Sequence, residues 1–94
     1  MTEYQSITQK ELEELISKQD SVIVDVQEKW EFADFNIGGI NIPPHEITER
    51  LDELNDYKNI IVVCTNGTRS AIVARLLSKK LPDKKIYHLE EGIY

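Results

Sequence analysis

Short apolar runs alternate with amphipathic stretches along this chain of 94 residues. Two runs rich in β-branched residues, 21–26 and 60–63, are almost continuously apolar, which is typical of strands buried on both faces of a parallel sheet. Shorter segments at 4–7, 40–42 and 85–89 complete the predicted strands. The pattern therefore indicates about five strands separated by other elements.

The stretches between these strands favour helices. Thr8 and Glu11 fit a capping box, and the apolar spacing that follows predicts a helix to about Lys18. The most apolar helical pattern, 71–81, is stopped by Pro82. Strands that alternate with helices indicate an α/β fold, with a mostly parallel sheet and helices on both faces. The two other predicted helices are one or two turns within 27–37 and an amphipathic helix from 45 to about 54.

Composition narrows the possible partners. The formal net charge of −6 disfavours nucleic acid and anionic membranes, because the mean field of the protein repels both. No run approaches the ~20 apolar residues of a membrane span. Residues 1–4 have neither the basic flank nor the apolar stretch of a signal peptide, so we expect a cytoplasmic protein. With one cysteine in the sequence, the chain can form no internal disulfide.

That cysteine, Cys64, stands where a predicted strand ends and a polar loop leads into a helix. Ligand sites of open α/β sheets lie at such positions. The thiolate is the nucleophilic form of cysteine. Loop amides and the positive end of a helix dipole would both favour it. The sequence therefore predicts a reactive cysteine in a cradle of backbone amides, although a lone cysteine that ends a strand is often simply a core residue.

The loop residues suit this cradle. Gly67 allows a positive φ and a close approach of the backbone. Arg69 adds a fixed positive charge with a planar fork of donors. Ser70 is well placed to cap the following helix. The small polar side chains of Thr65, Asn66 and Thr68 leave room in the loop.

Four segments in order resemble the single-domain rhodanese-like sulfurtransferases. The loop C-T-N-G-T-R-S (64–70) is similar to the active-site loop of that family. D-V-Q-E-K-W-E-F (25–32), N-I-G-G-I-N-I-P (36–43) and L-E-E-G-I (89–93) resemble the segments that surround it there. The resemblance covers nearly the whole chain. It implies a single rhodanese-like domain over 1–94, with a central, mostly parallel sheet of about five strands.

The resemblance also implies an activity. Cys64 would take sulfane sulfur from a donor such as thiosulfate or a persulfide-carrying protein, and would become a persulfide. A thiol or cyanide would then remove that sulfur, with no cofactor or metal. The loop would hold the terminal sulfur through Thr65, Asn66, Gly67, Thr68, Arg69 and Ser70. Because the chain has no second cysteine, the sulfur must leave on another molecule.

Two other functions compete with this interpretation. Cysteine phosphatases use a similar loop with five residues between cysteine and arginine. Here four residues lie between Cys64 and Arg69, and Val63 stands where phosphatases usually carry histidine. The second alternative is a binding or regulatory module with the same fold and no turnover. Three departures from the family pattern favour it: Gln27 in place of an arginine, Asn36 near a glycine–histidine pair, and Glu91 in place of a glycine.

The other acidic, aromatic and histidine side chains singled out in the sequence are expected to have structural roles. Asp25 ends a strand and is expected to accept backbone N–H bonds. Trp30, Phe32 and Phe35 are expected mainly in the core, with the mouth of a pocket as the alternative. His45 and His88 form no metal-binding pattern, and both are expected to be surface or capping residues.

Overall fold

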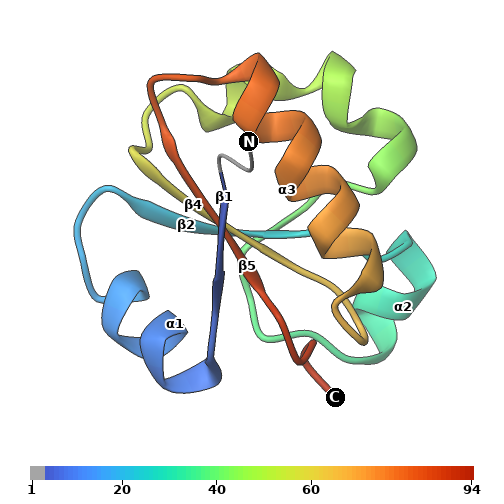
Figure 1. Cartoon of the computed structure of the whole chain (residues 1–94). Helices are drawn as coiled ribbons and strands as arrows, with labels where there is room; N and C mark the ends of the chain where they lie inside the picture. The colour runs from blue at the N-terminus through green and yellow to red at the C-terminus, as the bar shows by residue number, and fades with distance from the viewer. Residues whose placement is uncertain (1–3) are drawn as a thin grey trace.

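The computed structural model describes residues 4–94 and contains a five-stranded sheet in the order β1-β5-β4-β2-β3 (Figure 1). Each neighbouring pair of strands is parallel. This confirms the predicted α/β fold with its parallel sheet. Residues 1–3 of the N-terminal stretch considered above lie outside the described part. The strands are β1 (Tyr4–Ile7), β2 (Ser21–Asp25), β3 (Ile40–Asn41), β4 (Asn59–Val63) and β5 (Lys85–Leu89).

The α-helices lie where the sequence predicted them, with shifted ends. Helix α1 (Gln9–Ile16) begins with the predicted capping box of Thr8 and Glu11 and ends two residues earlier than expected. Helix α2 (Lys29–Asp34) has between one and two turns. Helix α3 (Thr68–Lys80) begins three residues earlier than predicted. As a result, α3 starts inside the loop that follows Cys64.

The prediction of one amphipathic helix from 45 to about 54 is wrong in the type of helix. The segment forms two 3₁₀ helices, η1 (Pro44–Glu49) and η2 (Leu51–Leu54). They are separated at Arg50, which has φ −120° and ψ 20°. The backbone therefore leaves helical geometry midway, while Ile47 and Leu54 still reach the core.

Two apolar layers cover the two faces of the sheet. Helix α1 lies on one side, whereas α3 and the 3₁₀ helices lie on the other (Figure 1). Because side chains alternate along a strand, β4 contributes Ile60 and Val62 to the α3 layer and Ile61 and Val63 to the α1 layer. Cys64 continues this alternation into the α3 layer. The strand is thus buried on both faces, as its continuous apolar run predicted.

The order of the strands places the cysteine loop at a switch point. From β2 the chain proceeds to β3 on one side, and from β4 it proceeds to β5 on the other. The loops that leave β2 and β4 therefore diverge at the carboxyl edge of the sheet, where open α/β folds bind ligands. The segments after Asp25 and after Val63, which are paired in register, meet at this edge.

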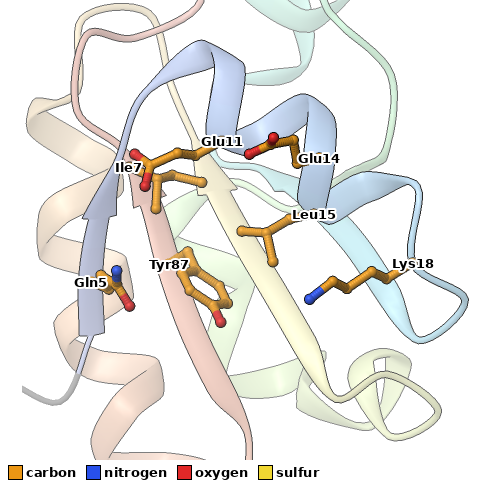
Figure 2. Close-up of a pocket in the computed structure, with 7 residues that line it drawn as sticks. All are labelled: Gln5, Ile7, Glu11, Glu14, Leu15, Lys18 and Tyr87. Atoms are coloured by element: carbon orange, nitrogen blue, oxygen red, sulfur yellow. The ribbon is translucent and has the colours of Figure 1, made fainter.

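A separate hollow of about 240 Å³ lies on the α1 side of the sheet. Figure 2 shows Ile7, Leu15 and Tyr87 on its walls, with Glu14 and Lys18 at its rim. None of the residues that line it belongs to the cysteine loop. Among residues 4–94, no helix has the length and apolar character needed to cross a membrane.

Candidate functional site

Cys64 receives two backbone hydrogen bonds on its sulfur. The amides of Gly67 and Ser70 lie 3.1 and 3.2 Å from Sγ. The residue is 0% exposed and also belongs to the apolar layer under α3. It is therefore as buried as a core cysteine, yet the amides around it point at the sulfur. Both donors lie at the start of a 13-residue helix.

Gly67 gives the loop the shape that this contact requires. Its φ of 89° is left-handed, and it is the N-cap of α3. A Cβ at this position would lie 2.1 Å from the carbonyl oxygen of Glu90. Both the conformation and the packing therefore demand glycine, and the close contact joins the loop to the end of β5.

Ser70 is not the helix cap that its sequence position suggested. Because α3 begins at Thr68, Ser70 lies within the first turn. Its hydroxyl donates to the carbonyl oxygen of Gly67 over 3.1 Å, while its amide donates to the sulfur. Ser70 thus holds the loop through both its backbone and its side chain.

Arg69 is held by a carboxylate from α2. Its two terminal nitrogens lie 2.6 and 3.0 Å from the two carboxylate oxygens of Glu31. The hydrogen bond from Arg69, with burial opposing it, lowers the pKa of Glu31 below its ordinary value. Arg69 also donates to Thr65 Oγ1 over 3.1 Å. The guanidinium charge that the loop supplies is therefore already neutralised.

Thr65 connects this ion pair to a buried polar network at the end of β2. Its hydroxyl donates to Gln27 Oε1, 3.0 Å away. The amide nitrogen of the Gln27 side chain donates to Asp25 Oδ2 and to the carbonyl oxygen of Phe35. Gln27 is fully buried, so the residue that departs from the family pattern here serves as the link between β2 and the loop.

Asp25 has the structural role expected of it. Its Oδ1 accepts the backbone N–H of Gln27 over 2.9 Å. Burial raises the pKa of Asp25, and the hydrogen bonds from Gln27 and the charge of Arg69 oppose part of that rise. The carboxylate therefore organises the turn after β2.

A pocket of about 340 Å³ opens beside this network. Trp30 on its wall is 73% exposed, which overturns the expectation that it packs in the core and places it at the pocket, the alternative considered. Helix α2 buries none of its residues. Phe35 is exposed as well, so its expected place in the core is also wrong, and its ring centroid lies 4.9 Å from that of Tyr94. The pocket is lined by Gln27, Trp30, Glu31, Asp34, Thr65 and Tyr94.

The remaining loop residues lie away from the sulfur. Asn66 and Thr68 are exposed. The Asn66 side chain accepts the backbone N–H of Thr68 over 3.1 Å, so this amide is directed at a side chain. The six loop residues thus divide into three groups. Gly67 and Ser70 contact the sulfur, and Asn66 and Thr68 lie on the surface. Thr65 lines the pocket, and Arg69 is bonded to Thr65 and to Glu31, which also lines it.

The expectation for His88 is also wrong. His45 is exposed, but His88 is only 5% exposed and lies on the α3 side of β5. Strand alternation could have indicated this, because Ile86 and His88 share one face and Ile86 is buried. Within residues 4–94, no three histidine, cysteine, aspartate or glutamate side chains are placed to hold a metal ion.

Glu31 and Gln27 were not among the predicted site residues. Both follow β2, which pairs with β4 in register from Ser21 to Asp25. Loops that leave neighbouring parallel strands meet at one edge, so the polar residues after β2 could have been placed beside Cys64. The signal was their position in the topology, since neither residue type is unusual by itself.

Comparison with known proteins agrees with this architecture. The rhodanese-like domain model matches residues 8–94. The Bacillus subtilis "Putative sulfur carrier protein YrkF" is 36% identical over an alignment of 93 residues, which covers 94% of this chain and 50% of that protein. The chain thus spans half the length of this relative.

Solved structures agree as well. A rhodanese-related protein from Thermoplasma volcanium is 33% identical with a TM-score of 0.80, over 96% of this chain and 87% of that one. A NAD-dependent persulfide reductase from A. fulgidus is 35% identical with a TM-score of 0.70, over 96% of this chain and 15% of the reductase. The chain belongs to the rhodanese-like domain family.

Proposed function

We propose that the protein is a sulfurtransferase that carries sulfane sulfur as a persulfide on Cys64. The observation on which this depends is the pair of N–H donors, from Gly67 and Ser70, that point at Sγ. Such donors can stabilise negative charge on sulfur, both on a thiolate before the attack and on a persulfide anion after it. The names of two similar proteins, a sulfur carrier and a persulfide reductase, support sulfur as the cargo.

The reaction has two displacement steps. The Cys64 thiolate attacks the outer sulfur of thiosulfate, a new S–S bond forms, and sulfite leaves with the electron pair of the broken S–S bond. An acceptor thiolate or cyanide then attacks the terminal sulfur of the persulfide. The S–S bond of the persulfide breaks, its electron pair goes to Sγ, and the Cys64 thiolate is restored. Two covalent steps on one nucleophile give ping-pong kinetics.

The other site residues support these steps. Gly67 and Ser70 hold the sulfur. Thr65 lines the pocket through which we propose that donor and acceptor approach, and Arg69 is bonded to Thr65 and Glu31 on its wall. Asn66 and Thr68 stabilise the loop through the hydrogen bond that the backbone N–H of Thr68 donates to the side chain of Asn66. A donor that carries a persulfide, on a small molecule or on a protein, would replace thiosulfate without changing the steps. We propose a cytoplasmic setting, because a free thiol is stable in that reducing compartment.

A binding module without turnover is the second candidate, and two observations favour it. Cys64 has no exposed surface, and Arg69 is already paired with Glu31. Under this interpretation the loop serves as a rigid support, and the pocket recognises a partner without chemistry on the sulfur.

Intact mass after incubation with thiosulfate distinguishes the two candidates. We expect a gain of one sulfur, about 32 daltons, that is lost when a thiol is added. The Cys64→Ser variant should show no gain, and its transfer of sulfur to cyanide should fall to the uncatalysed rate. Equal turnover in the wild type and Cys64→Ser, with no mass gain in either, would reject the sulfurtransferase and leave the binding module.

A further inference from the structure

His88 lies between the edge strand of the sheet and the cysteine loop. Its Nδ1 is 3.0 Å from Ser70 Oγ, and its Nε2 is 3.1 Å from Ser6 Oγ. The ring of Tyr4 meets the imidazole edge-on, with 5.5 Å between centroids. A buried titratable group therefore contacts a residue that donates to the sulfur of Cys64, and the reaction steps above leave it without a role.

The hydroxyl of Ser70 has a single proton and two neighbours that could accept it. One is the carbonyl oxygen of Gly67 at 3.1 Å, and the other is His88 Nδ1 at 3.0 Å. Both contacts are hydrogen bonds at once only if Nδ1 carries a proton and donates to Ser70 Oγ. Ser70 then donates to Gly67, and Nε2 of the neutral ring accepts from the hydroxyl of Ser6.

We propose that His88 is a positioning residue, whose Nδ1–H fixes the hydroxyl of Ser70 on Gly67 and so holds the amide cradle of Cys64 in shape. The direction of each bond follows from the one before it: Ser6 to His88, His88 to Ser70, and Ser70 to the carbonyl of Gly67. The inference rests on the proposed function only for its effect on sulfur transfer. The proposed tautomer and its effect on the loop geometry do not depend on sulfur transfer.

The surroundings of His88 favour the neutral ring that this arrangement uses. Burial lowers the pKa of His88, and the carboxylate of Glu90 opposes part of that effect. The direct partners of the imidazole are uncharged side chains, Tyr4 and Ser6 from β1 and Ser70 from α3. A ring that is neutral and donates through Nδ1 leaves Nε2 as an acceptor, which suits the hydroxyl of Ser6.

The tautomer can be measured directly from the ¹⁵N chemical shifts of the imidazole nitrogens. The sequence has two histidines, and the signals of exposed His45, which lies near Glu28 and Glu46, are assigned separately. We expect the neutral ring of His88 to be protonated at Nδ1. Protonation at Nε2 would overturn the proposal, whether or not the protein transfers sulfur.

Two substitutions of His88 distinguish the roles of its two ring nitrogens. The amide nitrogen of an asparagine side chain falls near the place of Nδ1, whereas that of glutamine falls near the place of Nε2. We therefore expect His88→Asn to retain the rate of persulfide formation on Cys64 in a single turnover. His88→Gln should lower it by about fivefold, the worth of one neutral hydrogen bond.

Helix α3 offers a matched control. Ser78 donates to the carbonyl oxygen of Arg75 over 2.7 Å, three residues back, as Ser70 does to Gly67. Both serines are buried, but Ser78 lies at the far end of the helix. Ser70→Ala should lower the loading rate by about fivefold, and Ser78→Ala should leave it unchanged. Thermal unfolding confirms that each variant is folded. Equal effects of the two alanines, or of His88→Asn and His88→Gln, would contradict a role in positioning.

Discussion

At the scale of single residues, the site depends on what neutralises Arg69. A free guanidinium beside the loop would attract an anionic donor, but here both of its terminal nitrogens are bound to Glu31. The pair is partly shielded, with 32% of the Arg69 side chain and 18% of the Glu31 side chain exposed. The arginine thus fixes α2 to the loop more than it offers a charge to the pocket.

Removing the carboxylate should release that charge. We expect Glu31→Gln to speed persulfide formation from thiosulfate by about fivefold, because one charge at a partly exposed site is worth ~1 kcal/mol. Loading from an uncharged persulfide donor should change little. The measurement is the rate of mass gain with each donor at low ionic strength.

A second ion pair in the chain provides the control. Arg50 is bound to Glu53 through Nε and a terminal nitrogen, at 2.6 and 3.0 Å. Glu53→Gln therefore removes a similar carboxylate away from the loop and should leave both rates unchanged. If Glu31→Gln slows thiosulfate loading, the ion pair is needed to shape the site and the electrostatic argument is wrong.

At the scale of elements, the loop and the end of β5 are fitted to each other through Gly67. We expect Gly67→Ala to lower the free energy of unfolding by about 3 kcal/mol or more, since the new methyl group meets the Glu90 carbonyl in addition to the strain of a positive φ. Gly38 has a similar φ of 97°, but nothing lies within 4 Å of the place that a methyl group would take there. Gly38→Ala should therefore cost only about 1 kcal/mol. Urea unfolding of both variants measures the difference, and equal losses would mean that strain alone sets the cost.

The helices and strands also show which parts of the fold could be predicted from the sequence. Periodicity located all five strands, and the Thr8 capping box was readable because it involves four consecutive residues. The split of 44–54 into two 3₁₀ helices could not be predicted from the sequence. The spacing of Ile47, Leu51 and Leu54 suits an α-helix as well. The difference arises at Arg50, whose backbone departs from helical angles without any signal in its residue type.

The same limit applied to the candidate site. The loop residues could be named because they are contiguous and follow a strand. Glu31, Gln27 and His88 reach the loop from other elements, at sequence separations of 18 to 38 residues. Only the order of the strands, in which β4 lies between β2 and β5, brings them together. A sequence pattern gives the strands, but their order in the sheet depends on packing across the whole core.

At the scale of the whole molecule, the net charge of −6 acts on every anionic donor. Thiosulfate is a dianion, and neither the loop nor the pocket, both within the described residues, offers it an unpaired arginine. We therefore expect thiosulfate loading of Cys64 to accelerate by about two- to threefold when ionic strength rises from about 10 mM to 0.3 M, because salt screens the repulsion. Stopped-flow or rapid-quench mass measurement gives the rate.

The control for this salt effect is alkylation of Cys64 by iodoacetamide, an uncharged reagent that meets the same thiolate. Its rate should be nearly independent of salt, which would exclude a change in the loop itself. In Glu31→Gln the acceleration should shrink or reverse, since a released Arg69 attracts the dianion at close range while the rest of the chain repels it. If wild-type loading instead slows with salt, a local positive field governs the approach of the donor. Arg69 would then act on the substrate despite its pairing, and the net charge of the molecule would have no part in the selection of the donor.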